Sequence, residues 1–281
     1  MKTVPAVSGR QGVHFMDHPG QGRLCRGSVR LRLLEAGLAV CAAMACLPGA
    51  MAGNVQTRQV LPGSHLDRSV LDDPGRPAEE RAQDAQRKAL EVYEWLGIRP
   101  GMTVADLFAS GGYNTHLLSR LMGEQGRVLS IFEFYADKEA FGGRLYKVDA
   151  VRERVRKNHL ENVKLVMKIS DIEPGSVDAM VAVRNYHDVQ WVFPGLTRKE
   201  VVNGIYRALK PGGVIGIVEV ATPKPGWDEK THRLNEQVVI DDFKKGGFVL
   251  AGRSSMLANP DDDHTTTGFQ EGRYTMDRYL L

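Results

Sequence analysis

The sequence predicts an α/β domain in which a doubly wound, mostly parallel sheet of seven strands carries helices on both faces. Strand-like runs alternate with helical stretches from residue 103 onward, a pattern typical of a parallel sheet. The stretch Thr103–Leu118 also reads as a strand, a glycine turn and a helix, the unit that opens such a domain. A length of 281 residues is enough for one sizeable core.

Residues 30–52 have the order of a secretory signal. Two arginines precede the apolar stretch Ala36–Leu47, and the small-residue cleavage site Ala50–Ala52 follows it. The apolar stretch is too short for a permanent membrane-spanning helix, and the alternative is a buried helix of the domain. We therefore expect a signal peptide over residues 1–52, no stable membrane span, and an exported, periplasmic chain after cleavage near Ala52-Gly53.

Charge and cysteine are unevenly distributed. All three cysteines lie in residues 1–52, so the remainder can form no disulfide and no thiolate metal site. The excess of positive charge behind the formal net charge of +3 lies there too. A nucleic-acid partner would need a basic footprint on the domain, and we expect no such partner.

The segment ahead of the first strand divides into two parts. Residues 53–77 are polar and aperiodic, which indicates a linker or an N-terminal arm. Residues 78–96 place alanines, Val92 and Leu96 on one stripe, which predicts an amphipathic helix that packs on the sheet or covers the cofactor cleft. The domain itself is expected over 78–281.

The alternation assigns the remaining elements. Strands are predicted at 103–108, 127–132, 163–168, 177–183, 214–220, 248–254 and 273–281. Helices are predicted at 148–159, 197–209 and 229–245, with His232 and Arg233 opening the last one. The late polar stretch Asp261–His264 is either a solvated turn or a metal site, and we expect the turn.

The turn after the first strand predicts a small-molecule site. Asp106 ends that strand and Gly111-Gly112 follow it. Glycine lets the backbone approach a ligand, and the next helix offers free N–H groups to a carboxylate or phosphate. A nicotinamide cofactor would need G-x-G-x-x-G here, which these residues lack. A nicotinamide oxidoreductase is therefore the weaker alternative.

Polar residues also follow the next strands. Glu133 stands 21 residues after Gly112, where an acid can accept hydrogen bonds from ribose hydroxyls. Ser170-Asp171 follows the third strand. Asn185–Asp188 follows the fourth and supplies an amide, a phenol, a base and a carboxylate where a connector needs only turn residues. The alternative is that His187-Asp188 merely caps the next segment.

These motifs resemble those of class I S-adenosylmethionine-dependent methyltransferases. Asp106–Gly112 stands where that family carries D-x-G-x-G-x-G, and Val177–Asp188 (VDAMVAVRNYHD) and Leu209–Glu219 (LKPGGVIGIVE) follow in the family's order. Within the family the chain looks most like predicted exported bacterial methyltransferases with an NYHD motif. The resemblance covers residues 75–281 and implies a Rossmann-like fold.

The glycine positions depart from the family pattern. Phe108 and Ser110 occupy the first two of them, and only Gly112 is kept. The resemblance still implies S-adenosylmethionine as the cofactor. The residues it assigns to cofactor binding are Asp106, Ser110, Gly111, Gly112, Tyr113, Glu133 and Asp171. In this assignment Asp106 holds the glycine loop and the amino group of the donor, or else only caps the loop, and Asp171 contacts the adenine.

The resemblance implies that Asn185 and Tyr186 line the methyl-transfer pocket and that His187 deprotonates the acceptor. A histidine pKa near neutrality suits a base. Because neighbours on an extended chain point opposite ways, we expect a residue other than Asp188 to orient His187. The ring face of Tyr113 or Tyr186 would favour the sulfonium charge.

The sequence thus predicts methyl transfer from S-adenosylmethionine to an unidentified acceptor, most simply a small molecule. The alternative is an exported ligand-binding protein that kept the fold and lost catalysis, which the altered glycine loop and the export signal favour. The other histidines are scattered and form no H-E-x-x-H pattern, so we expect no metal site. Glu219, at the end of the fifth strand, either reaches the site or is a plain strand-end acid.

Overall fold

The computed structural model describes residues 65–133, 146–191, 196–267 and 275–281. The chain divides into two units, Met1–Ala52 and Gly53–Leu281. The predicted signal peptide lies outside the described residues. Among the helices that the structure describes, none is both long and apolar enough to cross a membrane.

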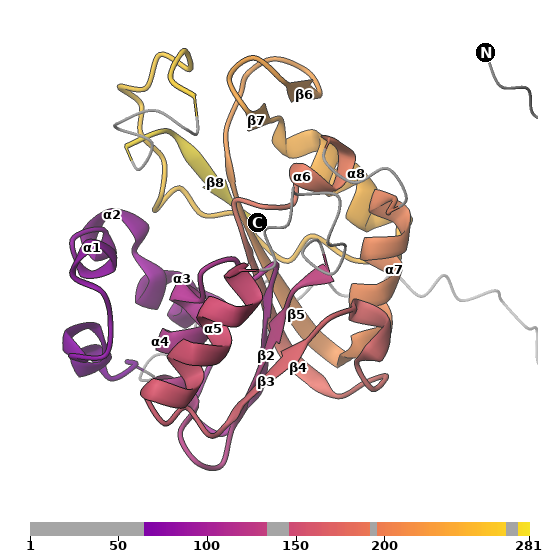
Figure 1. Cartoon of the computed structure of the whole chain (residues 1–281). Coiled ribbons are helices and arrows are strands. Elements are labelled where there is room, and N and C mark those ends of the chain that lie inside the picture. The colour runs from indigo at the N-terminus through magenta and orange to yellow at the C-terminus, as the bar shows by residue number, and fades with distance from the viewer. Residues whose placement is uncertain (1–64, 134–145, 192–195, 268–274) are drawn as a thin grey trace, which may run out of the picture. The chain divides into compact units, whose positions relative to one another are not determined.

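Six strands form the main sheet within the described residues, in the order β3-β2-β1-β4-β5-β8. The parallel strands are β1 (Thr103–Leu107), β2 (Arg127–Ile131), β3 (Val163–Val166), β4 (Val177–Val183) and β5 (Leu209–Val220). β8 (Arg278–Leu280) pairs antiparallel with β5. The strand order reverses between β1 and β4, and ligands of open α/β sheets bind outside the carboxyl ends at such a point. The predicted α/β fold class is confirmed (Figure 1).

The strand predicted at 248–254 does not form a ladder. Within it, only an isolated bridge joins Ser254 to Leu280. The physical reason is that β8 already pairs with the last residues of β5, so the backbone hydrogen-bonding groups at this edge of β5 are occupied. The sheet therefore has six strands in the described part of the chain, where the sequence predicted seven.

Helices cover both faces of the sheet. Figure 1 shows α3 (Ala89–Trp95), α4 (Tyr113–Met122) and α5 (Tyr146–Lys157) on one side, and α7 (Arg198–Ala208) and α8 (Glu236–Lys245) on the other. The buried side chains form two clusters. One cluster contains Leu117 of α4 and Val104 of β1, and the other contains Ile205 of α7 and the next residue of β1, Ala105. Successive residues of a strand point to opposite faces, so the sheet is held between two packed layers of helices.

The predicted helix over 78–96 is broken into three. They are α1 (Ala78–Arg81), α2 (Asp84–Arg87) and α3, with Lys88 in the left-handed region at φ 49° between the last two. Ahead of them, η1 (Arg68–Asp72) packs onto the domain, because Leu66 and Val70 are buried in the cluster beside α3 and α4. The arm from residue 65 is therefore part of the folded domain.

The predicted helix over 229–245 is shorter than expected. α8 begins at Glu236, and the preceding residues form a hairpin of β6 (Trp227–Asp228) and β7 (Arg233–Leu234). The prediction that His232 and Arg233 open a helix is therefore wrong. Two short elements complete the described fold, η3 (Ile169–Asp171) and α6 (Asp188–Trp191).

Candidate functional site

The glycine loop, residues 108–112, keeps a left-handed backbone at all three positions where the resemblance places glycine. The φ angles are 60° at Phe108, 49° at Ser110 and 82° at Gly112. Two of these residues are not glycine, and such conformations cost of the order of 1–3 kcal/mol each unless the surroundings enforce them. The surroundings do so here, because Phe108 is buried and its carbonyl accepts a 3.0 Å hydrogen bond from Asn185 Nδ2.

The two glycines of the loop have different roles. A Cβ on Gly112 would lie 3.0 Å from Val151 Cγ2, so this position packs tightly against α5. A Cβ on Gly111 would meet no described atom within 4 Å. The loop is thus held from behind by α5 and is open at Gly111, where a ligand can approach the backbone.

Asp106 lies at the end of β1 and is only 1% exposed. Its carboxylate accepts hydrogen bonds from Thr115 Oγ1 at 2.7 Å and from Asn114 Nδ2 at 3.3 Å. Burial raises the pKa of Asp106 to about 6 in spite of these bonds. The structure therefore gives Asp106 the role of holding the first turn of α4, and its contact with a donor stays a prediction.

The N-terminal helices pack against the loop and the start of α4. Tyr113 donates a 2.6 Å hydrogen bond to Asp84, which also pairs with the buried Arg76. The Arg87 guanidinium lies over the Tyr113 ring, 4.1 Å from its centroid. Since a cation already covers this ring, the predicted role of Tyr113 in favouring a sulfonium charge through its ring face is not supported.

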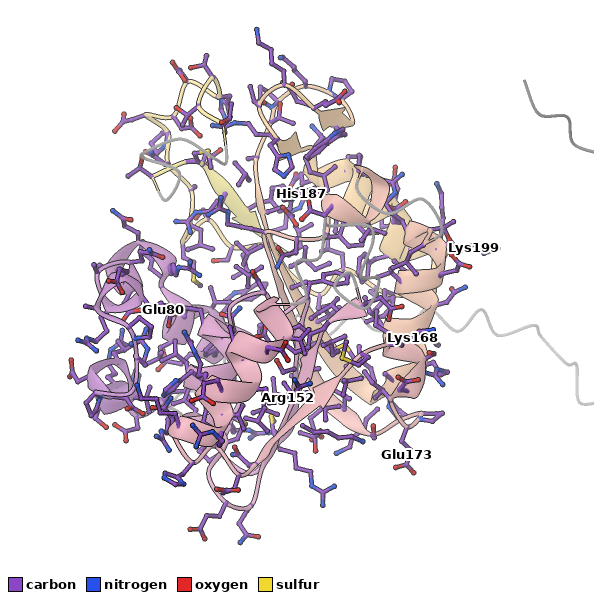
Figure 2. All side chains as sticks on the ribbon, viewed as in Figure 1. Glu80, Arg152, Lys168, Glu173, His187 and Lys199 are labelled. Carbon is purple, nitrogen blue, oxygen red and sulfur yellow. The ribbon has the colours of Figure 1, made fainter. Side chains whose placement is uncertain are left out.

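Arg154 of α5 also links the N-terminal helices to the glycine loop. Arg154 donates to the Gly112 carbonyl at 3.0 Å and forms a 2.5 Å ion pair with Glu80 of α1, which Figure 2 labels. These contacts hold α1 near the glycine loop, and the expectation that the segment covers the cofactor stays a prediction.

Three guanidinium groups surround a small cavity beside the start of α4. The arginine group consists of Arg87, Arg184 and Arg278, and the lining of the cavity also includes Tyr113 and Asn114. Burial, together with the charges of Arg184 and Arg87, lowers the pKa of Arg278 to about 10. Arg278 Nε is buried and has no hydrogen-bond partner among the described residues. An anion in this cavity would relieve the crowding of positive charge.

The acids after the second and third strands lie near each other. The Glu133 carboxylate accepts a hydrogen bond from the backbone N–H of Ile169. Burial raises the pKa of Glu133, and the charge of Asp171 raises it further. The structure thus brings Glu133 and Asp171 to the same region of the carboxyl edge, and their contacts with ribose and adenine stay predictions.

The three residues predicted to be catalytic separate in space. Asn185 joins the loop after β4 to the glycine loop through its bond to Phe108. Tyr186 is 0% exposed, donates to Asp242 of α8 at 3.0 Å and packs against Phe243. The ring of Tyr186 is thus part of the core beneath α8, and its role in lining the methyl-transfer pocket stays a prediction.

His187 lies at the end of the sheet that carries α6 and the β6–β7 hairpin, whereas Glu173 lies at the opposite end (Figure 2). Its Nδ1 is 2.6 Å from Glu219 Oε2, and Glu219 also accepts the backbone N–H of Tyr186 at 2.7 Å. The orienting residue of His187 is thus a residue from elsewhere, as expected. Trp227 stacks on the His187 ring, with centroids 5.1 Å apart.

The predicted near-neutral pKa of His187 does not agree with this environment. Burial alone would lower the pKa of His187, but the carboxylates of Glu219 and Asp188 outweigh it and raise the pKa to about 10. An imidazole held in this way is protonated at neutral pH and is a poor general base. Asp188 Oδ1 lies 3.2 Å from His187 Nε2, because the chain turns into α6 here instead of staying extended.

Sequence reasoning missed part of this site. His232, in the β6–β7 hairpin, places its Nε2 2.8 Å from His187 Nε2, although 45 residues separate the two. The arginine group also went unrecognised. Arg278 comes from the last strand and Arg87 from α2, and no local motif connects them. By contrast, Arg233 and Asp262 form a buried 2.7 Å ion pair, which explains the late polar loop structurally.

The chain is similar to known methyltransferases. Curated relatives include ubiquinone/menaquinone biosynthesis C-methyltransferases of Legionella pneumophila (strain Lens) and Klebsiella pneumoniae (strain 342). The first is 27% identical over 140 residues, covering 47% of this chain and 50% of the relative. The second is 27% identical over 131 residues, covering 45% and 46%. The chain therefore spans about half the length of the curated relatives it matches.

A solved structure with the same fold is a SAM-dependent methyltransferase from Aquifex aeolicus, with a TM-score of 0.51 and 18% identity, over 67% of this chain and 92% of that one. The model of the protein-L-isoaspartate(D-aspartate) O-methyltransferase family matches residues 84–253. This match includes β1 to β5 and the whole glycine loop. The chain belongs to the protein-L-isoaspartate(D-aspartate) O-methyltransferase family and is a class I methyltransferase whose cofactor is S-adenosylmethionine.

Proposed function

We propose that this protein transfers the methyl group of S-adenosylmethionine to a small-molecule acceptor at the carboxyl edge of its sheet. The observation that carries the proposal is the glycine loop. Phe108 and Ser110 replace two glycines and yet hold the left-handed backbone that glycine would supply. The chain has kept a strained loop shape at the topological switch point, and strained loops of this kind cluster at ligand sites.

The described residues fit the donor at both of its ends. The buried Arg278 Nε lacks a partner in the described structure, and burial with two neighbouring guanidinium charges lowers the pKa of Arg278, so a carboxylate such as that of the donor's methionine would be stabilised beside it. Glu133 would accept hydrogen bonds from the ribose hydroxyls, and Asp171 would lie toward the adenine. The open side of Gly111 leaves room for the donor to approach the backbone.

The bound donor would supply a methyl group on a positively charged sulfur, which the acceptor nucleophile displaces. The contribution of the protein is to align the two reactants. Asn185 serves this alignment, because its bond to the Phe108 carbonyl holds the loop after β4 against the glycine loop. Asp106 serves it by holding the first turn of α4 through Thr115 and Asn114.

The acceptor side of the site would lie beyond Asn185. Trp227, His187 and His232 gather there as a compact group of rings, with centroids 4.3–5.1 Å apart. Such a surface suits a small, planar molecule with polar substituents. The relatives and the matching family suggest two acceptor classes that an experiment can compare, a quinone precursor and an isoaspartyl protein.

Calorimetric titration of the purified protein with S-adenosylmethionine, S-adenosylhomocysteine and NAD tests the donor. We expect both sulfur compounds to bind and NAD not to bind. Glu133→Gln should weaken donor binding about 10- to 150-fold, the cost of one charge-assisted hydrogen bond. Glu173→Gln, an exposed acid at the opposite end of the sheet, is the matched control and should change nothing.

The acceptor is tested by the release of S-adenosylhomocysteine with two panels, hydroxylated aromatic compounds and isoaspartyl peptides. Turnover with the first panel only is the expected result. Turnover with the peptides only would refute the small-molecule acceptor. Tight donor binding without turnover in either panel is the result that the ligand-binding alternative predicts, and binding of NAD alone would refute the donor assignment.

A further inference from the structure

Three side chains at the end of β4 and in the β6–β7 hairpin direct one potential ligand atom each to a common point. His187 Nε2 lies 2.8 Å from His232 Nε2 and 3.2 Å from Asp188 Oδ1. His232 Nε2 lies 3.4 Å from the same carboxylate oxygen. The two nitrogens and one oxygen therefore form a nearly equilateral triangle, and among the described residues no other group of three or more His, Cys, Asp and Glu converges in this way.

The size of this triangle matches one face of a metal coordination shell. Ligands about 2.1 Å from an ion and separated by 90–110° are about 3.0–3.4 Å apart. The observed distances run from 2.8 to 3.4 Å. The distances between the three atoms would therefore admit an ion after shifts of a few tenths of an ångström.

A buried carboxylate holds the His187 ring in the form that ligation requires. Glu219 accepts at Nδ1 of His187 and has no exposed side-chain surface. Glu219 accepts at Nδ1, so Nδ1 carries a hydrogen, and the proton that a metal ion has to displace is the one on Nε2, which faces His232 and Asp188. Metal-bound histidines almost always have such a carboxylate or carbonyl partner on the other ring nitrogen.

The donor set selects the class of ion. Two imidazole nitrogens and one carboxylate oxygen suit Zn²⁺, Fe²⁺, Co²⁺ or Ni²⁺, whereas Mg²⁺ and Ca²⁺ prefer oxygen ligands throughout. Three protein ligands leave coordination positions for water or another molecule. The side chains of His187, His232 and Asp188 are 4%, 11% and 24% exposed, so the site is shielded but reached from the Asp188 side.

We propose that His187, Asp188 and His232 form a binding site for a divalent first-row transition-metal ion, with Glu219 as the positioning residue of His187. The site adjoins Asn185 along the chain. A role for the ion in catalysis rests on the proposed function: its open positions would take an oxygen or nitrogen of the acceptor. The expectation from the sequence that no metal site exists would then be wrong, because the ligand from the hairpin lies too far along the chain to form a motif.

The test uses the untagged protein after dialysis against a chelator. Titration with Zn²⁺ and with Co²⁺ is followed by calorimetry and, for Co²⁺, by the visible ligand-field bands of the bound ion. We expect one ion per chain. Asp188→Asn and His232→Gln should each weaken binding at least about 100-fold, and Glu219→Gln about 10- to 100-fold. His159→Gln removes an exposed histidine beside Glu161 and should bind as the wild type does.

Asp188→Asn preserves the shape of its side chain, so it keeps the test decisive if a histidine variant fails to fold. Far-ultraviolet circular dichroism confirms the fold of each variant. Two results would overturn the proposal: no saturable binding of Zn²⁺ or Co²⁺ by the wild type, or equal affinity in the wild type, Asp188→Asn and His232→Gln. Because no methyl donor or acceptor is present, failure here leaves the proposed methyl transfer standing.

Discussion

Replacing Asp106 with asparagine should make the protein more stable at neutral pH while weakening its hold on the donor. Asp106 is almost fully buried, and burial raises its pKa from 3.8 to about 6. At pH 7 the carboxyl is nevertheless ionised, so the folded protein carries a charge in a place that disfavours it. The asparagine side chain would remove the charge and keep the size of the group.

The magnitude follows from the pKa difference. Two units correspond to about 3 kcal/mol. The folded state binds the Asp106 proton more tightly than the unfolded state does. The free energy of unfolding of the wild type therefore falls by about this amount as the pH rises from about 4 to 6, and it stays lower at higher pH. Asparagine does not titrate, and the free energy of unfolding of Asp106→Asn should therefore lack this decline.

The substitution also has a cost. The new amide can still accept from Thr115 Oγ1, but its NH₂ group would face Asn114 Nδ2, which now lies 3.3 Å from a carboxylate oxygen. Asn114 cannot turn over freely, because its oxygen accepts a 2.8 Å hydrogen bond from Tyr93. One lost hydrogen bond costs about 1 kcal/mol. The net result is a gain of about 1–2 kcal/mol at pH 7 and a loss of about 1 kcal/mol at pH 4.

A buried charge of this kind is retained where it serves a ligand, and the amino group of the donor is positively charged. Asp106→Asn should therefore bind S-adenosylmethionine about 10- to 150-fold more weakly. Urea unfolding between pH 4 and 7.5 measures the stability, and calorimetry at pH 7.5 measures the affinity. Unchanged affinity would leave Asp106 with only its role in holding α4.

Asp178→Asn is the matched control. Hydrogen bonds from Lys210 and from the Thr103 N–H outweigh burial and lower the pKa of Asp178. The ionised Asp178 carboxylate therefore stabilises the folded wild type above the unfolded pKa, and this contribution is lost as the pH falls. Asp178→Asn should be less stable than the wild type at pH 7, and the difference should shrink in acid. Its donor affinity should not change, because it pairs with the opposite end of β1. If both variants differed from the wild type by the same amount at every pH, the reasoning from burial would be refuted.

Three further predictions address other parts of the chain. Ser110→Gly should leave donor affinity intact and change stability by at most about 1 kcal/mol, because glycine accepts the φ of 49° without strain; a clear loss of affinity in calorimetry would contradict the reasoning that this position needs only its backbone shape. Arg233→Met should destabilise the protein by about 3–5 kcal/mol in urea, since it leaves the Asp262 carboxylate unpaired; a wild-type midpoint would contradict this. Protein recovered from the cell envelope should begin at Gly53, and an intact mass that retains Ala52 and the residues before it would disprove cleavage there.

Local pattern was sufficient for the framework of this protein. The run from Thr103 to Leu118 predicted a strand, a turn and a helix, and the structure places β1, the glycine loop and α4 there. Strand periodicity and turn chemistry act over a few residues, so they can be read directly from the chain. The same holds for α7, which was predicted at 197–209 and which Thr197 caps together with Glu200 in a capping box.

Long-range pairing decided what local pattern could not. The helix predicted over 78–96 is broken beside Asp84, whose carboxylate binds Arg76 and Tyr113. The strand predicted at 248–254 lost its place to β8. In both cases a partner distant in sequence competed with the local preference, and tertiary context overrides propensity when its contacts are worth more.

The candidate site shows the same division. Asp106, Glu133 and Asn185 lie at or just beyond the carboxyl ends of β1, β2 and β4, as the positions of the predicted strands indicated. The direction of each side chain was beyond the sequence: Tyr186 turns into the core, and His187 turns toward Glu219 and His232. Residue types and strand ends are properties of the chain itself. Which side chains converge on one point depends on how the hairpin, α8 and the last strand pack, and only the tertiary structure decides that.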